Sequence, residues 1–100
     1  MPRDPRTVLS EALAEALAAE APEAGAMAIA LERPKNAAHG DWFSNIALQA
    51  ARRSGRNPRE LAQKLCAAPV WRSLADMVES PQVAGPGFIN FRLRPAAKLA

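Results

Sequence analysis

The sequence has few of the residues that most often carry catalysis, metals or cross-links. It contains one cysteine, one histidine and no tyrosine among its 100 residues. Cys66 therefore has no internal disulfide partner, and no cluster of Cys and His indicates a structural metal site. A reducing, cytoplasmic setting fits this composition best. Because Cys66 sits in an apolar helical pattern, we predict that it is a small core residue.

Long apolar runs are also missing. No segment approaches the roughly 20 apolar residues that a transmembrane helix needs, so we expect no membrane partner. Arg3 and Arg6 are not followed by the apolar stretch of a secretion signal. The composition is 49% hydrophobic and 23% charged, which is typical of a globular protein. A chain of this length can build one domain with an ordinary core.

Charge is unevenly distributed along the chain. Residues 1–23 hold two basic and five acidic side chains, whereas residues 24–100 hold eleven basic and five acidic ones. A basic body indicates a polyanionic partner such as nucleic acid, although a solvated surface rich in arginine explains it equally simply.

Capping and spacing signals predict three helices. Asp4 and Pro5 suit the start of a helix over about 5–20, whose apolar residues recur at helical spacing. Asp41 resembles the N-cap of a second helix over about 42–54, closed by Gly55 and with Phe43 on its buried face. The run 57–60 (NPRE) starts a third helix that ends before Pro69, and residues 70–76 are expected to be a short helix or turn.

Alternation of apolar and other residues predicts strands over 26–32, 77–84 and 88–93. Pro81 weakens the second of these and places it at an edge or a bend. The turn at 85–87 (GPG) joins the last two strands into a hairpin. The fold class that follows is α+β: a two-layer domain in which a small antiparallel sheet with a C-terminal hairpin packs against helices.

The last strand has two different faces. Ile89, Phe91 and Leu93 form a wholly apolar set, which we expect to face the helices. The opposite set begins with Phe88, a ring that could stack on an unpaired base. Its other members are an amide that could bind a base edge and a guanidinium that could bind phosphate, Asn90 and Arg92. Alternatively, Phe88 packs at the rim of the sheet and the two polar residues are simply solvated.

Other positions offer less specific chemistry. His39 precedes Gly40 and could serve in acid–base work, or it could bond backbone in a loop. No nucleophile motif accompanies it, and the turn at 85–87 lacks the lysine of a phosphate loop, so we predict no catalytic residues and no metal in this chain. Lys35 could contact phosphate. The arginines between 52 and 59 form either a polyanion site or a helix-end feature that needs no ligand.

Two blocks of this sequence resemble a known family. Residues 84–93 (AGPGFINFRL) are similar to the end of the N-terminal additional domain of bacterial arginyl-tRNA synthetases. Residues 34–47 (PKNAAHGDWFSNIA), followed by 57–62 (NPRELA), resemble an earlier block of the same domain, in the same order. The resemblance covers residues 30–94, and residues 95–100 look like the start of a connection to an absent catalytic domain.

The resemblance implies a tRNA-binding domain, over residues 1–94, that contacts the D-loop of tRNA(Arg). It implies a parent class I synthetase that joins arginine to tRNA using ATP, while this fragment alone is not catalytic and holds no cofactor. The implied base contacts are Phe88 and Asn90, held by the turn of Gly85, Pro86 and Gly87. Further implied contacts are Arg92, Lys35 and His39. Two alternatives stay open: a domain that only braces the catalytic core, and a small independent enzyme that uses His39.

Overall fold

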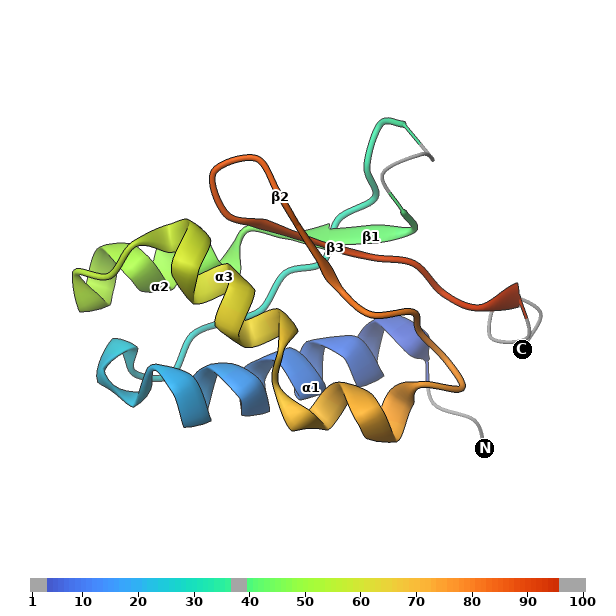
Figure 1. Cartoon of the computed structure of the whole chain (residues 1–100), viewed down its shortest axis with the longest axis horizontal. Helices are drawn as coiled ribbons and strands as arrows, with labels where there is room; N and C mark the ends of the chain where they lie inside the picture. The colour runs from blue at the N-terminus through green and yellow to red at the C-terminus, as the bar shows by residue number, and fades with distance from the viewer. Residues whose placement is uncertain (1–3, 37–39, 96–100) are drawn as a thin grey trace.

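The chain folds as a small three-stranded sheet with its helices on one side, as the ribbon in Figure 1 shows. This computed structural model describes residues 4–36 and 40–95. Its elements, in chain order, are α1 (Pro5–Glu20), η1 (Pro22–Ala24), β1 (Trp42–Ser44), α2 (Ile46–Ser54), α3 (Pro58–Cys66), η3 (Pro69–Leu74), β2 (Gln82–Ala84) and β3 (Phe88–Phe91). The predicted α+β class, with helices against an antiparallel sheet that ends in a hairpin, is confirmed.

Helix α1 forms where the sequence predicts it. The Asp4 carboxylate accepts a hydrogen bond of 3.3 Å from the backbone N–H of Arg6, and Pro5 occupies the first turn. The helix buries an apolar stripe against the rest of the core, made of Leu9, Ala12, Leu13, Ala16 and Leu17. It ends at Glu20, two residues before Pro22 begins the short helix η1.

The second predicted helix begins later than expected. Residues 42–44 form strand β1, and α2 starts at Ile46 with Asn45 at the N-cap position. Asp41 does not cap a helix: its Oδ2 accepts a hydrogen bond of 2.7 Å from the backbone N–H of Leu93. The predicted end is right, because Gly55 adopts the left-handed conformation with a φ of 70°.

Helix α3 also follows its local signals. The Asn57 side chain accepts a 3.0 Å hydrogen bond from the backbone N–H of Glu60, and Pro58 opens the first turn. The helix ends at Cys66, before Pro69. A short helix or turn was expected at 70–76, and the structure has the 3-10 helix η3 there, over Pro69–Leu74. Trp71 from this segment is buried and donates a 2.7 Å hydrogen bond to the carbonyl of Leu65.

Strand β3 lies in the middle of the sheet, between β1 and β2, and both pairings are antiparallel. The strand predicted at 77–84 is shorter than expected, with β2 limited to Gln82–Ala84 and an isolated bridge between Val78 and Leu93. The strand predicted at 26–32 is wrong. Within the described residues that segment pairs at Glu32 alone, in a bridge to Phe43.

One close approach fixes the start of β1 against β3. The N–H of Asp41 donates a 2.8 Å hydrogen bond to the carbonyl of Phe91. Gly40 precedes it with a φ of 107°, and a Cβ at that position would lie 2.7 Å from the same Phe91 oxygen. Since both the backbone angle and the space exclude larger residues, glycine is required there.

Two classes of feature are absent from the described part of the chain. Across residues 4–36 and 40–95, none of the helices combines the length and apolarity needed to cross a membrane. The same residues contain no group of three or more His, Cys, Asp or Glu side chains arranged to hold a metal ion.

Candidate nucleic-acid interface

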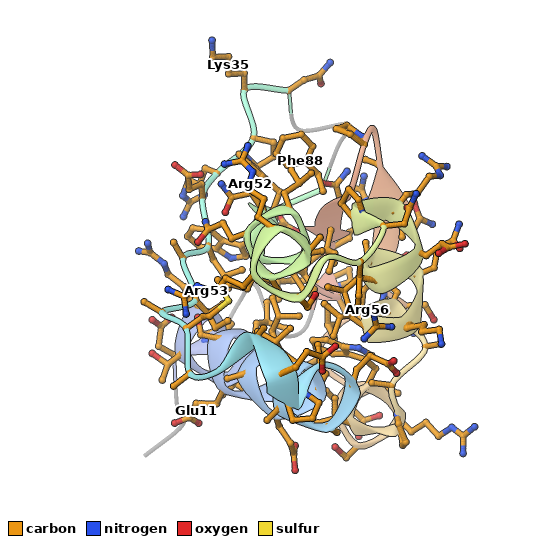
Figure 2. The ribbon with its side chains drawn as sticks, turned by 90° about the vertical axis from the view of Figure 1, so that its left-hand side faces the viewer. Glu11, Lys35, Arg52, Arg53, Arg56 and Phe88 are labelled. Atoms are coloured by element: carbon orange, nitrogen blue, oxygen red, sulfur yellow. The ribbon has the colours of Figure 1, made fainter. Side chains whose placement is uncertain are left out.

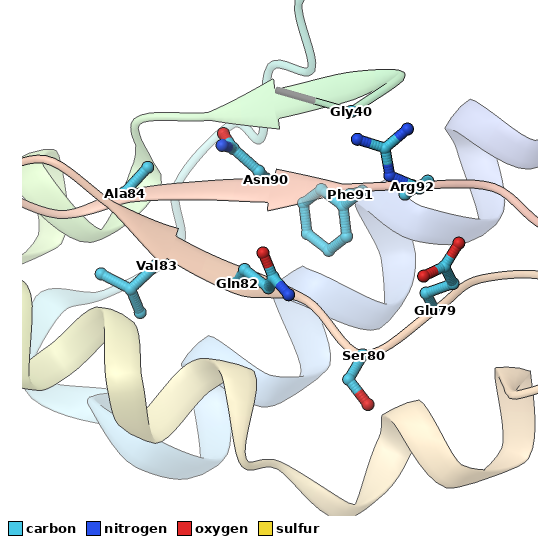
Figure 3. Close-up of a pocket in the computed structure, with 9 residues that line it drawn as sticks. All are labelled: Gly40, Glu79, Ser80, Gln82, Val83, Ala84, Asn90, Phe91 and Arg92. Carbon is cyan, nitrogen blue, oxygen red and sulfur yellow. The ribbon is translucent and has the colours of Figure 1, made fainter. Parts of the chain in front are cut away.

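The two faces of β3 differ as the alternation predicts. Ile89 and Phe91 are fully buried and Leu93 is almost so, on the side that the helices cover. Phe88 and Asn90 are half-buried and Arg92 is exposed, on the opposite side of the sheet. Figure 3 shows Asn90 and Arg92 projecting from β3 away from the helices. The sheet therefore has an outer face, defined here as the side that carries Phe88, Asn90 and Arg92.

Strand register brings two further side chains to the outer face. Phe43 of β1 and Gln82 of β2 both lie directly opposite Asn90, one on each side. Residues directly opposite one another in antiparallel strands project to the same face, so the three side chains form a row across the sheet. Alternation along a single strand does not point to Gln82, and the helix predicted over 42–54 wrongly placed Phe43 on its buried face. Counting outward from the 85–87 turn would have paired Gln82 with Asn90.

The two phenylalanines pack against each other. Their ring centroids are 5.8 Å apart and the ring planes meet at 77°, so the edge of one ring meets the face of the other. They border an open pocket of about 480 Å³, which we call the aromatic pocket. Its lining is Glu32, Arg33, Pro34, Lys35, Phe43, Ala84, Phe88 and Asn90.

A second pocket shares Asn90 and Ala84 with the aromatic pocket. This polar pocket has a volume of about 250 Å³, and Figure 3 shows its residues. It is lined by Gly40, Glu79, Ser80, Gln82, Val83, Ala84, Asn90, Phe91 and Arg92. The amides of Gln82 and Asn90 make no hydrogen bond with any residue in the described part of the chain, which leaves both free for a ligand.

The turn before β3 is held by the start of α3. Arg59 donates a 2.6 Å hydrogen bond from Nη1 to the carbonyl of Gly85. Gly87 has a φ of 151°, and a Cβ there would lie 3.1 Å from the carbonyl oxygen of Pro58. The predicted positioning turn of Gly85, Pro86 and Gly87 is thus packed closely against α3, and this contact fixes where β3 begins.

The arginines predicted to cluster between residues 52 and 59 differ in what their side chains contact. Arg56 donates to the carbonyl and to the carboxylate of Glu20 at 2.9 and 3.0 Å, and Arg53 donates to the carbonyl of Ala24 at 3.3 Å. Figure 2 shows Arg53 and Arg56 toward α1, whereas Lys35 and Phe88 lie at the top of the view. Arg53 and Arg56 therefore bond to η1 and α1 within the protein, whereas Arg52 and Arg53 both remain exposed to solvent.

Contacts made by residues close to Lys35 hold the segment that carries it. The guanidinium of Arg33 lies 4.6 Å from the centre of the Trp42 ring, and that of Arg6 lies 5.2 Å from it. Arg6 also donates a 2.9 Å hydrogen bond to the carbonyl of Leu31. These contacts bring exposed Lys35 to the aromatic pocket. His39, the other loop residue of the predicted site, lies outside the described residues.

Cys66 offers no reactive group at this interface. Its side chain is half-buried and packs against the core instead of lying within it as predicted, and burial raises the pKa of its thiol from 9.0 to about 12. The thiol is therefore protonated at neutral pH and is a poor nucleophile.

Comparisons with known proteins agree on one family. The family model for the "Arginyl tRNA synthetase N terminal domain" matches residues 6–93. The chain is 48% identical over 100 residues to an arginine–tRNA ligase from Azoarcus sp. (strain BH72), covering all of this chain and 16% of that protein. A Burkholderia thailandensis arginine–tRNA ligase is 55% identical over 74 residues, which are 73% of this chain and 12% of that protein.

One solved structure is similar to this chain in both fold and sequence. The arginyl-tRNA synthetase of Thermus thermophilus superposes with a TM-score of 0.69 at 29% sequence identity. The match covers 95% of this chain and 15% of the Thermus chain. The sequence described here thus spans only a small part of the length of the relatives that it resembles.

Proposed function

The chain belongs to the arginyl-tRNA synthetase N-terminal domain family, and from this premise we propose that its outer sheet face binds tRNA(Arg) at the D-loop. Residues 1–94 are the tRNA-binding domain in this proposal, and 95–100 begin the connection to a catalytic domain. The parent protein attaches arginine to tRNA with ATP in the cytoplasm. This domain supplies tRNA contacts and no catalytic group.

The observation that carries the proposal is the placement of Asn90 beside a pair of aromatic rings. Phe43 packs edge-to-face with Phe88, which limits the motion of the ring that borders the aromatic pocket. A flat ring of this kind can stack on an unpaired base, at about 1–3 kcal/mol per stacked base. The Asn90 amide can both donate to and accept from a base edge. Together they can bind one base that has left the loop's stack.

Positive side chains at the same face suit the phosphate backbone. Lys35 and Arg33 border the aromatic pocket, and Arg92 borders the polar pocket. Cations of this kind contribute affinity and position without discriminating between bases. Arg53 and Arg56 are given no such role in this proposal, because they already donate hydrogen bonds to η1 and to the end of α1.

A second candidate function, bracing of the catalytic core, is favoured by an apolar pocket of about 380 Å³ beside α1. Its lining includes Leu17, Pro22 and Met27. An apolar surface of this kind suits another part of the same protein better than it suits nucleic acid. This pocket lies away from the outer sheet face, so the two functions can be separated by mutation.

The test is Asn90→Ala in the full-length protein, with arginine tRNA transcripts that carry each base at every D-loop position. We expect a loss of about 1–3 kcal/mol for the native transcript and relaxed discrimination at one D-loop position. Gln63→Ala, which alters an exposed residue of α3, is the matched control. Unchanged charging kinetics for every D-loop variant would show that Asn90 does not recognise a base.

A further inference from the structure

The polar pocket has its own chemistry, distinct from that of the aromatic pocket. It contains the Gln82 amide and shares the Asn90 amide with its neighbour, and it adds the Ser80 hydroxyl. Glu79 and Arg92 supply one charge of each sign at its end. The pocket is therefore rich in hydrogen-bonding groups and has no net charge from its lining.

A lining that is rich in hydrogen-bonding groups and has no net charge favours one class of ligand over others. A phosphate group inside the pocket would meet the Glu79 carboxylate as well as the Arg92 guanidinium, so the lining offers it no net positive charge. A neutral group with both donors and acceptors can instead be satisfied by amide, hydroxyl and carboxylate together. The edge of a nucleobase has this composition, and the two unpaired amides on adjacent strands present both kinds of atom to it.

The geometry relates the polar pocket to the aromatic one. Phe43 and Gln82 lie in one row on opposite sides of Asn90, Phe43 in the aromatic pocket and Gln82 in the polar pocket, and the two pockets share Asn90 and Ala84. Adjacent strands are about 4.8 Å apart, which puts Phe43 and Gln82 roughly 10 Å from each other across the sheet. Neighbouring nucleotides of a single-stranded loop can place splayed bases across such a span.

We propose that the polar pocket binds the base of a second unpaired nucleotide, adjacent in the loop to the one held at Phe88, and that Gln82 recognises its edge. This inference rests on the proposed function of the outer sheet face and extends it from one base to two. Gln82 suits the role because it is exposed on an edge strand, so its amide can adjust to a ligand without altering the core.

The experiment uses the full-length protein and measures binding of arginine tRNA transcripts substituted singly at each D-loop position. Gln82→Leu removes the amide with little change of size, and Gln82→Glu keeps the length but removes the donor. We expect either variant to weaken the native transcript roughly five- to tenfold, as for the loss of one or two hydrogen bonds. Gln63→Leu, on α3, is the matched control and should stay within twofold.

The transcript series assigns the base. The penalty of Gln82→Leu should disappear when one D-loop nucleotide is already substituted, and that nucleotide should be next to the one coupled to Asn90. Coupling of Gln82 and Asn90 to the same nucleotide, or an effect of Gln82→Leu below twofold, would overturn the second base site. If Asn90→Ala retains its effect in that case, the proposed tRNA-binding function still stands. Absence of both effects would remove both proposals.

Discussion

Arg59 at the start of α3 donates a hydrogen bond of 2.6 Å to the carbonyl of Gly85 in the turn before β3. This contact joins the helical layer to the turn that places Phe88. Arg59 is thus tied to protein rather than free for phosphate, yet it lies next to the face proposed to bind tRNA. Its effect on binding should therefore be exerted through the position of Phe88.

Replacement of Arg59 by Ala should lower tRNA affinity severalfold while reducing the free energy of unfolding by about 0.5–1.5 kcal/mol, the usual contribution of one exposed hydrogen bond. Arg59→Lys should restore part of the affinity, because an ammonium can also donate to a carbonyl. Titration with tRNA and urea unfolding measure the two effects. Arg72→Ala, at an exposed site on η3, is the control. An affinity loss from Arg59→Ala no larger than the control's would contradict the positioning role.

Gly40→Ala should destabilise the fold more than Gly55→Ala does. Both glycines have positive φ, at 107° and 70°, so both substitutions strain the backbone. Nothing lies within 4 Å of a Cβ at Gly55, whereas a Cβ at Gly40 would lie 2.7 Å from the Phe91 oxygen. We expect about 1–2 kcal/mol for Gly55→Ala, the cost of a left-handed conformation for a residue with a Cβ, and about 2–4 kcal/mol for Gly40→Ala, because a backbone clash adds to strain. Equal midpoints in urea would disprove the close approach.

Lys35→Gln should reduce the salt dependence of tRNA binding. If the ammonium neutralises one phosphate, the slope of log K against log salt should fall by about 0.7, the value for a single-stranded contact. Lys64→Gln provides the comparison, since its ammonium lies 3.8 Å from the Glu20 carboxylate on the helical side. Parallel slopes for the wild-type and Lys35→Gln proteins would exclude a phosphate contact at Lys35.

The thiol of Cys66 should make stability fall at high pH. Burial raises its pKa from 9.0 to about 12, so above pH 9 the unfolded chain loses a proton that the folded chain keeps. The unfolded state is then favoured, and the free energy of unfolding contributed by this group declines between about pH 9 and 12. Unfolding of the wild-type and Cys66→Ala proteins across this range isolates the effect. A stability difference between them that does not change with pH would contradict it.

Local signals explain which helices were predictable. Asp4 with Pro5, and Asn57 with Pro58, each satisfy a helix start within a few residues, and both helices begin where expected. Asp41 has the same local appearance, but its partner is the backbone N–H of Leu93, 52 residues away. A contact between residues so far apart in the chain cannot be detected from a short window of sequence. Residues 42–44 were therefore predicted to begin a helix, although they form β1.

The candidate site was partly predictable for a related reason. Alternation along β3 is a property of one strand, so the outward placement of Phe88, Asn90 and Arg92 could be inferred directly. Phe43 and Gln82 reach the same face through strand register, which depends on pairing between distant segments. Segment 26–32 shows the opposite error. Its period-two pattern predicted a strand, but the pattern alone cannot supply a neighbouring strand for it to pair with.

The contact between Phe43 and Phe88 joins segments on either side of α2 and α3. The aromatic pocket consequently exists only when the whole domain is assembled, and an unfolded chain has no equivalent of it. A ligand that binds only the folded state raises the melting temperature in proportion to the logarithm of its concentration. The cognate nucleic acid should therefore act as a thermal stabiliser of this domain, and a shift in melting temperature can screen RNA loops without any aminoacylation assay.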